Sequence, residues 1–415
     1  MKSIREIAFK NKLVFLRVDF NVPLDDAGQI ADDARIKAAL STIEYILQKG
    51  GKLVIGSHMG RPKGEANPKF SVKPVADRLG ELLGKEILFV GDCIGPKVEK
   101  VKVGMKAGDV LLLENLRFYP QEKDNDIHFA EQLSKDIDVY ITDAFGVVHR
   151  KHASTFALPS LIYDKGIGFL IESELEALGK IVDNPEKPFV VVIGGIKISD
   201  KVDVIRSLAP MSDVILTGGG VANTFIKGLG QDVGGSIVES DSVGEGQDAT
   251  NYVDLAREIY DAFNTDATGI AITTPNGKPL QKIQIPLDFI AAPNTDAGAP
   301  TKIIEVGEAV PTGWMFLDIG PKTQKLYREV LEQANTIFWN GPVGLFEMNE
   351  YSAGSHTVAQ AIADSKGYAV LGGGDTEVVT EKFGLKGKYS HSSTGGGASL
   401  TFLAQKELPG LGALD

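Results

Sequence analysis

The sequence predicts a two-domain α/β protein in which each domain is built on a doubly wound parallel sheet. Short apolar runs rich in β-branched residues alternate with amphipathic stretches along the whole chain, which is the pattern of repeated β-α-β units. The chain has 415 residues, enough for two or three domains of ordinary size. The turns that follow the apolar runs carry arginines in the first half and glycines in the second half, which indicates different ligands for the two domains.

Buried strands are expected where short apolar runs are bounded by turn residues. In the first half they are predicted at residues 13–18, 53–55, 110–113 and 139–141. In the second half they are predicted at residues 189–193, 214–216, 283–285, 336–339 and 368–371. Helices are expected between the strands, because apolar side chains recur every three or four residues, as at Ala38, Leu40, Ile43, Ile46 and Leu47.

The boundary between the domains is predicted around an amphipathic stretch, IESELEALGKIV, which is followed by the acidic, proline-flanked turn DNPEKP. We expect an N-terminal domain at residues 1–170, a linker helix at residues 171–185 and a C-terminal domain at residues 186–397. Two polar segments, residues 239–251 and 273–282, are predicted to be surface loops or insertions.

Charge and cysteine content exclude several classes of function. The net charge is −12 and the isoelectric point is about 5.1, which argues against nucleic acid and anionic membrane surfaces as partners. The single cysteine, Cys93, allows neither an intramolecular disulfide nor a cysteine-based zinc site, and it is consistent with a reducing compartment. The sequence shows no signal peptide and no apolar run long enough to span a membrane, so a cytoplasmic location is expected.

Basic side chains follow the predicted strands of the first half, and ligands of open α/β sheets bind beyond these carboxyl ends. A single arginine is usually a solvated surface charge, and His58 alone would more often be structural. Four arginines at one sheet edge are different, because each presents a planar fork of donors that matches phosphate and carboxylate oxygens. They predict a site for a small, multiply anionic ligand. The residues concerned are Asp19, Asn21, Arg35, His58, Arg61, Arg117 and Arg150.

Glycines occupy the corresponding positions of the second half. The turns are GG at residues 194–195, GGG at 218–220, NGP at 340–342 and GGGDT at 372–376. Glycine allows backbone N–H groups to approach a phosphate, and the N-terminus of a following helix adds positive potential. One such turn is explained equally well by backbone sterics, whereas four at one sheet edge indicate a nucleotide.

Charged residues beside these turns are candidates for phosphate and metal contacts. Lys197 and Lys201 are four residues apart, so they would share one face if a helix begins there. They are either surface lysines of that helix or ligands of a transferring phosphate. Asp375 either caps the helix after the GGG turn or holds Mg²⁺, which prefers one or two carboxylates together with phosphate oxygens. A further glycine run, STGGGAS at residues 393–399, opens another helix.

Two standard nucleotide fingerprints are missing from the sequence. There is no G-x-x-x-x-G-K-[ST] motif, so the chain is not a P-loop kinase, and there is no G-x-G-x-x-G motif of a dinucleotide-binding dehydrogenase. The six histidines have no metal-ligand spacing with the cysteine. His149 and His152 are therefore expected to be polar loop residues.

The motifs together resemble the phosphoglycerate kinase family in that family's order from Arg17 to Leu400. They are RVDFNVP, SHMGRP, ENLRF, DAFGVVHRKHAS, GGIKISDK, LTGGGVANTF, DIGPKT, WNGPVGLFE, GGGDT and STGGGASL. The resemblance implies two Rossmann-like domains joined by a helix, with the tail at residues 398–415 returning to the N-terminal domain. It also implies a cytoplasmic, monomeric glycolytic enzyme that exchanges phosphate, with Mg²⁺, between ATP or ADP and 3-phosphoglycerate or 1,3-bisphosphoglycerate.

The family's functional residues carry over to matching positions of this chain. Its phosphoglycerate site implies Asp19, Asn21, Arg35, His58, Arg61, Arg117 and Arg150. Its nucleotide site implies Lys197, Lys201, Gly219, Pro342, Glu347, Gly373, Gly374, Asp375 and Thr376, with Asp375 associated with the metal. The groups implied to surround the phosphoryl in flight, and so to be catalytic, are Arg35, Lys201, Gly373 and Gly396.

Some positions depart from the family pattern, and other classes of function need weighing. Ile196 and Ile198 replace other apolar residues beside the glycine turn, and Val147 and Val148 replace a small pair, which leaves nucleotide preference open. A non-catalytic nucleotide-binding scaffold would keep the glycines without needing the arginines. A different α/β ligase or a dehydrogenase would need a fingerprint of its own.

The residue inventory also suits the implied chemistry. The acceptor is a carboxylate that is already ionised at neutral pH, so no general base is required, and phosphoryl transfer depends mostly on positioning and charge stabilisation. In-line transfer needs reacting atoms about 3–3.5 Å apart, while the two predicted ligand sites lie on different domains. We therefore expect hinge bending, with hinges near residues 166–170, 184–188 and 391–397.

Overall fold

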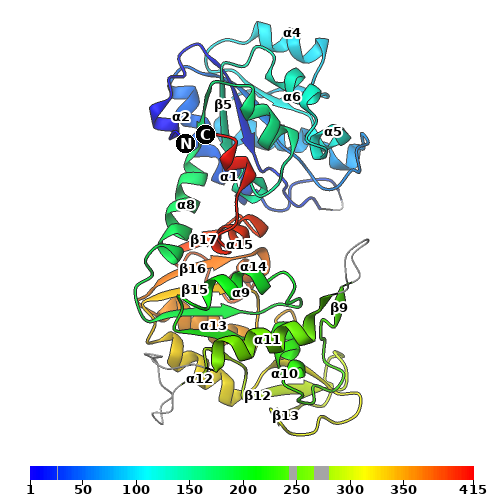
Figure 1. Cartoon of the computed structure of the whole chain (residues 1–415). Helices are drawn as coiled ribbons and strands as arrows, with labels where there is room; N and C mark the ends of the chain where they lie inside the picture. Colours follow the sequence, from blue (N-terminus) through cyan, green and yellow to red (C-terminus); the bar gives the residue numbers. More distant parts are fainter. Residues whose placement is uncertain (26, 243–249, 266–279) are drawn as a thin grey trace. The chain divides into compact units, whose positions relative to one another are not determined.

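The computed structural model describes the chain of 415 residues except for residue 26 and residues 243–249 and 266–279 (Figure 1). Its contacts divide the chain into two compact units. The first unit consists of Met1–Glu176 with Glu407–Asp415, and the second consists of Ala177–Lys406. Each unit is built on a six-stranded sheet in which all neighbouring strands are parallel. The predicted α/β class with two doubly wound sheets is therefore confirmed.

The sheet of the first unit has the strand order β3-β4-β2-β1-β5-β6. Its strands are β1 (Leu13–Val18), β2 (Lys52–Gly56), β3 (Leu88–Val90), β4 (Val110–Leu113), β5 (Val139–Asp143) and β6 (Asp164–Ile167). Because the chain leaves β1 towards β2 and later returns to its other side with β5, the winding reverses at β1. A crevice for ligands is expected at the carboxyl ends of the strands where such a reversal occurs.

The main sheet of the second unit repeats this plan with the order β11-β8-β7-β15-β16-β17, and the winding reverses at β7. Its strands are β7 (Phe189–Ile193), β8 (Val214–Thr217), β11 (Ile283–Gln284), β15 (Thr336–Asn340), β16 (Tyr368–Gly372) and β17 (His391–Ser393). A separate antiparallel sheet is formed by β12 (Asp288–Ala292), β13 (Lys302–Glu305) and β14 (Met315–Ile319).

The nine predicted strands are present, but several others were not predicted. β3 has three half-buried residues and β6 has the sequence DKGI, so neither forms an apolar run. In β13 three of the four residues are exposed. The predicted loop at residues 239–251 contains the paired short strands β9 (Asp241–Ser242) and β10 (Thr250–Asn251). Parts of this loop and of the other predicted loop, at residues 243–249 and 273–279, lie outside the described residues.

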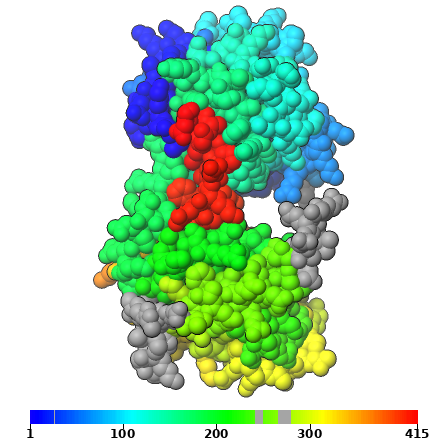
Figure 2. Space-filling view, viewed as in Figure 1, coloured from blue at the N-terminus to red at the C-terminus, as the bar shows by residue number. Residues whose placement is uncertain are grey.

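Helices of the first unit connect its strands and enclose a core of buried aliphatic side chains such as Val14, Leu16 and Ile55. These helices are α1 (Ala34–Ala38), α2 (Leu40–Gln48), α3 (Lys73–Leu83), α4 (Pro96–Gly104), α5 (Pro120–Lys123), α6 (Ile127–Ser134), α7 (Leu158–Ser160) and α16 (Pro409–Gly412). The tail contributes α16, and the Gly410 N–H donates to the Val148 carbonyl at 2.8 Å. Figure 2 shows the last residues, in red, at the surface.

Helices of the second unit surround a core that includes Trp339, Tyr327 and Val192. They are α9 (Val202–Leu208), α10 (Gly219–Gly228), α11 (Tyr252–Asn264), α12 (Pro321–Leu331), α13 (Ala353–Asp364), α14 (Gly374–Lys382) and α15 (Gly397–Leu403). α8 (Phe169–Val182) runs across the division between the units, where the linker helix was predicted. None of the helices in the described part of the chain is long and apolar enough to cross a membrane.

Candidate active site

Asn115 fastens together two of the loops that follow strands of the first unit. Its amide oxygen accepts hydrogen bonds from the N–H groups of Met59 at 3.2 Å and Arg117 at 3.0 Å. Its amide nitrogen donates to the Met59 carbonyl at 2.7 Å and the Phe70 carbonyl at 2.9 Å. Because Asn115 is fully buried, these four bonds satisfy the amide and fix the loop that carries His58 and Arg61 against the loop that carries Arg117.

The predicted substrate residues then meet through a second set of bonds. Arg35 Nη1 donates to Asp19 Oδ2 at 2.7 Å, and Asn21 Oδ1 accepts from the Gly60 N–H at 2.8 Å. Arg117 Nη1 donates to the Gly60 carbonyl at 2.8 Å. The structure therefore brings Asp19, Asn21, Arg35 and Arg117 to one edge of the sheet, at the point where the winding reverses.

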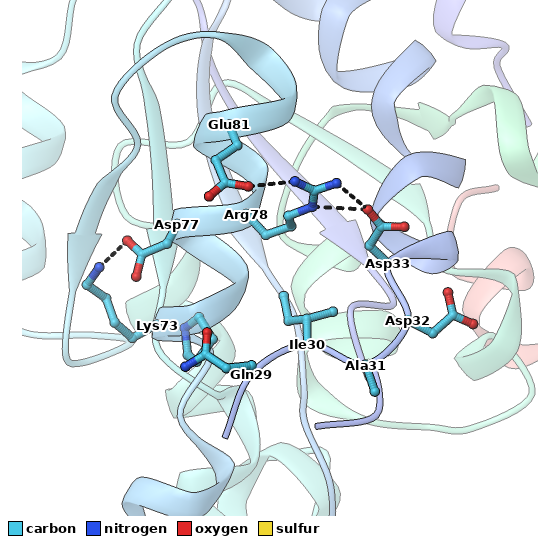
Figure 3. Close-up of a pocket in the computed structure, with 10 residues that line it drawn as sticks. Gln29, Ile30, Ala31, Asp32, Asp33, Lys73, Asp77, Arg78 and Glu81 are labelled. Carbon is cyan, nitrogen blue, oxygen red and sulfur yellow. Dashed lines mark hydrogen bonds and ion pairs between the residues drawn. The ribbon is translucent and has the colours of Figure 1, made fainter. Parts of the chain in front are cut away.

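The short helix α1, which carries Arg35, is held from outside this edge by Arg78 of α3. Arg78 donates from Nε and Nη2 to Asp33 Oδ2 at 3.0 and 2.8 Å (Figure 3). Hydrogen bonds from Lys37 and Arg78 lower the pKa of Asp33. Asp33 and Arg78 line a cavity of about 550 Å³ between α3 and residues 29–33, and none of the predicted site residues lines it.

Positive charge is crowded within the predicted substrate site. His58 is buried, and burial together with the arginines around it holds the pKa of its imidazole well below the ordinary value. Burial and the charges of Arg17 and Arg150 lower the pKa of Arg117 to about 10. Burial also lowers the pKa of Arg150, and nearby Arg61 and Arg17 lower it further. An anionic ligand would relieve this repulsion, so the electrostatics fit the predicted ligand class.

Two further histidines lie beside the cluster. Arg150 Nε donates to His149 Nε2 at 3.1 Å. Burial, followed by Arg150, lowers the pKa of His149 to about 4, and burial with the surrounding arginines lowers that of His152 to about 3. Both imidazoles are therefore neutral at physiological pH, and both residues lie outside helices and strands, as the sequence predicts.

Arg17 is a part of the site that sequence reasoning missed. It is fully buried, its Nε donates to Ser154 Oγ at 2.8 Å, and its Nη2 lies 3.5 Å from His58 Nδ1. Ser154 Oγ in turn donates to the buried Glu122 at 2.6 Å. The sequence feature that could have revealed Arg17 is its place inside the otherwise apolar strand β1, because a buried charge needs a partner.

Three of the four residues predicted to surround the phosphoryl meet in the second unit. Lys201, Gly373 and Gly396 line one cavity of about 400 Å³, together with Asn340. Lys201 Nζ donates to Asn340 Oδ1, and the amide nitrogen of Asn340 donates to the Gly372 carbonyl at 2.7 Å. Burial lowers the pKa of Lys201, while Asp200 and Asp375 act in the opposite direction. The fourth residue, Arg35, belongs to the first unit.

The helix that would place Lys197 and Lys201 on one face does not begin before them. α9 begins at Val202, with Lys201 as its N-cap residue, and Lys197 is exposed in the preceding loop. The N–H groups of Gly194 and Gly195 donate to the carbonyls of Asn340 and Pro342 at 2.9 and 2.8 Å, which draws the chain along β15 before a helix can begin. A Cβ at Gly194 would lie 2.1 Å from the Pro342 carbonyl oxygen, so only glycine permits this approach.

The remaining predicted nucleotide residues lie on the other glycine turns of the second unit, except for Glu347, which follows the NGP turn by five residues. Gly219 begins α10, and its N–H donates to the Val343 carbonyl at 3.0 Å. Thr376 Oγ1 accepts from the Gly341 N–H at 2.8 Å and donates to the Gly372 carbonyl at 2.9 Å, which ties the NGP turn to the GGGDT turn. The Glu347 carbonyl accepts from Lys382 Nζ at 3.1 Å.

Asp375 lies in the first turn of α14, after Gly374, and it is exposed. Gly373 occupies the N-cap position and no side chain caps this helix, so Asp375 is not its cap. Within the described residues, no group of three or more His, Cys, Asp or Glu side chains could hold a metal ion by itself. A lone carboxylate fits Mg²⁺ that is otherwise held by phosphate oxygens and water.

Comparisons with known proteins place the chain among its relatives. The family model described as phosphoglycerate kinase matches residues 4–406. The chain belongs to the phosphoglycerate kinase family. The phosphoglycerate kinase of Moorella thermoacetica is 46% identical to it over 412 residues, which cover 99% of this chain and 98% of the relative. That of Thermosipho africanus is 47% identical over 416 residues, which cover 99% and 97%.

Solved structures of phosphoglycerate kinases share the fold of this chain. The enzyme from Coxiella burnetii is similar with a TM-score of 0.84 at 34% identity, covering 100% of this chain and 98% of that one. The enzyme from Pyrococcus horikoshii OT3 is similar with a TM-score of 0.82 at 35% identity, with the same coverage. The chain is therefore a kinase enzyme, a phosphotransferase of glycolysis, as the motifs predict.

Proposed function

We propose that this chain catalyses the reversible transfer of the acyl phosphate of 1,3-bisphosphoglycerate to ADP, which gives ATP and 3-phosphoglycerate. The observation that carries the proposal is the contrast between two sites, each within one unit. The first unit crowds guanidinium groups around a buried His58, and the second unit lines a cavity with Lys201, Gly373 and Gly396. Both kinds of site suit phosphate, and they differ in the groups that they would present to it, which are guanidinium groups in the first unit and a lysine with glycine turns in the second.

The first unit would bind phosphoglycerate through guanidinium groups and uncharged hydrogen-bonding side chains. Arg61, Arg117 and Arg150 would contact the phosphate oxygens, since guanidinium groups match phosphate geometry. Asp19 and Asn21 would bind the hydroxyl and orient Arg35, which Asp19 already holds at 2.7 Å. His58 would serve as a neutral hydrogen-bonding group, because burial keeps its pKa low.

The second unit would bind the nucleotide through backbone donors and lysines. Gly219, Pro342 and Glu347 would contact the nucleoside part, and the turn from Gly373 to Thr376 would receive the phosphates at the N-terminus of α14. Asp375 would hold Mg²⁺ with the phosphate oxygens of the nucleotide. When bound there, the ion would supply charge neutralisation for the phosphates.

For the transfer, a carboxylate oxygen of 3-phosphoglycerate would attack the γ-phosphorus of ATP, and the bond between that phosphorus and the β–γ bridging oxygen would break. Arg35, Lys201 and the N–H groups of Gly373 and Gly396 would stabilise the charge on the transferring group. The carboxylate needs no general base. The lowered pKa of Lys201 reflects burial, so its ammonium group would act with little competing water.

Transfer would also require the two units to bring their ligands together. We propose hinge bending at the ends of α8 and near β17, on the physical ground that reacting atoms must come within about 3–3.5 Å and water must be excluded. The active species would be a monomer of the cytoplasm. Small-angle scattering tests both points: the radius of gyration should fall when both ligands are present, at a mass of one chain. An active enzyme whose scattering curve does not change with both ligands would rule out closure.

A coupled assay tests the function itself. ATP, Mg²⁺ and 3-phosphoglycerate should together give 1,3-bisphosphoglycerate, detected as NADH oxidation by an added dehydrogenase. Omission of either substrate should abolish the signal. Nucleotide binding without turnover would favour the alternative of a non-catalytic scaffold, and turnover with a different acceptor would favour another α/β phosphotransferase.

A further inference from the structure

The loop that carries Lys197 and Lys201 lacks regular secondary structure, so its shape depends on a few anchors. Gly194 and Gly195 fix its beginning to β15. Ile198 is fully buried in the middle, and Ile196 and Lys197 are exposed. The N–H groups of Lys201 and Val202 donate to the Ile198 carbonyl at 2.8 and 3.0 Å, which leads the chain into α9. Between Ile198 and Lys201, one residue offers a side-chain anchor, and that residue is Ser199.

Ser199 is held at two atoms by one carboxylate. Its N–H donates to Glu239 Oε2 at 2.8 Å, and its hydroxyl donates to Glu239 Oε1 at 2.6 Å. Hydrogen bonds to an ionised acceptor are about twice as strong as neutral ones, and the pairing of both oxygens also fixes direction. Glu239 lies 40 residues further along the chain, in a segment that the sequence predicts only as a surface loop.

Glu239 is itself fixed to the glycine turn that begins α10. Its N–H donates to Thr224 Oγ1 at 3.3 Å, and Thr224 Oγ1 donates to the Gly220 carbonyl at 2.8 Å. At the same turn the lysine loop passes very close, because a Cβ at Gly220 would lie 2.2 Å from the Ile196 carbonyl oxygen. Glu239 therefore joins two parts of the proposed nucleotide site, the loop with Lys197 and Lys201 and the turn with Gly219.

We propose that Glu239 is a positioning residue for the phosphoryl-transfer reaction. It acts through Ser199 to hold the lysine loop against α10, so that the ammonium groups of Lys197 and Lys201 stand where the phosphates arrive. This inference rests on the proposed function. It assigns a role to a residue that touches neither substrate, and it predicts that the bond between Glu239 and Ser199 matters more for turnover than for folding.

The expected effect follows from the geometry of the anchor. Glu239→Ala removes the acceptor of two donors on Ser199, so the loop can shift towards other partners such as water. A misplacement of about 1 Å can cost up to about 10²-fold in rate, so kcat should fall about 10- to 100-fold. The dissociation constant for 3-phosphoglycerate should not change, because the proposed phosphoglycerate residues belong to the other unit. The melting temperature should change little, because Glu239 and Ser199 are both half-exposed.

The experiment compares Glu239→Ala, Ser199→Ala and the double variant in the coupled assay, with calorimetry of 3-phosphoglycerate as a measure of folded protein. Glu258→Ala, an exposed glutamate on α11, is the matched control and should keep wild-type kcat. The double variant should be no slower than the slower single variant, within about twofold, because both changes remove the same bond. Ser199→Thr keeps the hydroxyl group and should stay within a few-fold of wild type.

Two results would overturn the inference. One is a normal kcat for Glu239→Ala in protein that binds 3-phosphoglycerate normally, and the other is a double variant whose loss is the product of the two single losses. If Glu239→Ala does not fold, Glu239→Gln decides in the same way, since it keeps one oxygen acceptor and should show an intermediate loss. An inactive wild-type protein would instead contradict the proposed function.

Discussion

The two proposed binding regions of this molecule are built by different means. In the first unit, side chains would do the binding: Arg17, Arg117 and Arg150 lie near His58, and burial together with their mutual repulsion lowers the pKa values of His58, Arg117 and Arg150. In the second unit, the cavity that Lys201 lines combines glycines of two turns, Gly373 and Gly396, with side chains of α9 and α15, and burial lowers the pKa of Lys201. The first region gathers several guanidinium groups around one imidazole, whereas the second combines lysine and aspartate side chains with glycine turns.

The two regions would therefore select their ligands in different ways. A small anion offers few atoms, so a strong site for it needs several charges at fixed angles, and the side-chain network around Asn115 supplies that rigidity. A nucleotide offers a longer surface that a backbone can follow. Glycine turns give that access, and helix N-termini add positive potential without mobile side chains.

The largest effect is expected when Arg35 is removed, because this guanidinium group of the first unit would stabilise charge in the transition state. Arg35→Ala should lower kcat by about 10²–10³-fold, roughly 2.7–4 kcal/mol, as for the loss of one transition-state donor. The coupled assay measures it, and Arg257→Ala on the exposed face of α11 is the matched control. Near-normal turnover by Arg35→Ala would remove this arginine from the mechanism and leave the first unit as a binding site only.

Lys201 is the corresponding group of the second unit. Lys201→Ala should lower kcat by about 10²-fold with a smaller change in the dissociation constant of ATP, because only interactions that strengthen in the transition state raise kcat. Steady-state kinetics together with nucleotide titration separates the two quantities. A change confined to the KM for ATP would show that Lys201 binds the ground state, and the comparison with Arg35 would fail.

Substitution of Asp375 tests whether Mg²⁺ binds with the nucleotide and not with 3-phosphoglycerate. Asp375→Asn should raise the Mg²⁺ concentration needed for half-maximal rate and weaken MgADP about tenfold, since one carboxylate ligand is lost. Binding of 3-phosphoglycerate should stay unchanged. Calorimetric titration of both ligands checks this, and equal weakening of both ligands would contradict the metal role.

The two units should also differ in their response to acid. His58, His149 and His152, all in the first unit, have pKa values held below the ordinary 6.5, at about 4 for His149 and about 3 for His152. In the unfolded chain they take up protons first as the pH falls, so stability of the first unit is lost from about pH 6.5 towards pH 4. Burial raises the pKa of one aspartate in each unit, Asp143 in the first and Asp318 in the second, to about 7. Each of these carboxyl groups makes its unit more stable as the pH falls, which is opposite to the effect of the histidines. Because each unit has one such aspartate, the two contributions cancel when the acid responses of the units are compared.

Two optical probes can separate these responses. The two tryptophans, Trp314 and Trp339, both belong to the second unit, whereas far-ultraviolet circular dichroism reports on both units. Between pH 7 and pH 5 the melting temperature from circular dichroism should fall by about 5 °C, a loss of about 1–2 kcal/mol, and the fluorescence transition should fall less. A fluorescence transition that falls as far or further would contradict the assignment of acid sensitivity to the first unit.

A smaller effect is expected at Gln405 of the second unit, which has a left-handed backbone conformation although it is not glycine. α15 ends with hydrogen bonds from the Gln405 N–H to the Phe402 carbonyl and from the Lys406 N–H to the Thr401 carbonyl, and Gln405 has a φ of 54°. This is the helix ending that favours glycine, so Gln405→Gly should stabilise the protein by about 0.5–1 kcal/mol. Urea unfolding followed by fluorescence measures it. Ala404→Gly, at a φ of −74°, should not stabilise, and an equal gain in both variants would exclude the backbone explanation.

The sequence predicted the parts of the fold that depend on continuous apolar runs. β1, β4 and β7 begin and end at the predicted residues, because each is buried along its whole length. β6 and β13 escaped prediction, because charged residues interrupt both of these edge strands and leave no continuous apolar run. The start of α9 could not be fixed from the sequence, because the backbone bonds that hold the preceding loop come from Asn340 and Pro342, which are distant in sequence.

The candidate site shows the same limit at the level of single residues. The motifs predicted Asp19, Arg35 and Lys201 as site residues. In the structure Arg35 donates a hydrogen bond to Asp19, and Lys201 lines a cavity together with Gly373 and Gly396. Arg17 and Glu239 were missed, since their importance lies in partners far along the chain: Ser154 for Arg17 and Ser199 for Glu239. Local patterns identify groups that meet a ligand, but not the groups that hold them.

We propose that phosphoglycerate binds to the first unit and the nucleotide to the second. Calorimetry on two exposed variants tests it most directly, because neither Arg61 nor Lys197 is buried in its unit. Arg61→Ala should weaken 3-phosphoglycerate about tenfold or more and leave MgADP unchanged, whereas Lys197→Ala should weaken MgADP and leave 3-phosphoglycerate unchanged. If either variant weakens the other ligand, or both ligands equally, the division of the two sites between the units is contradicted.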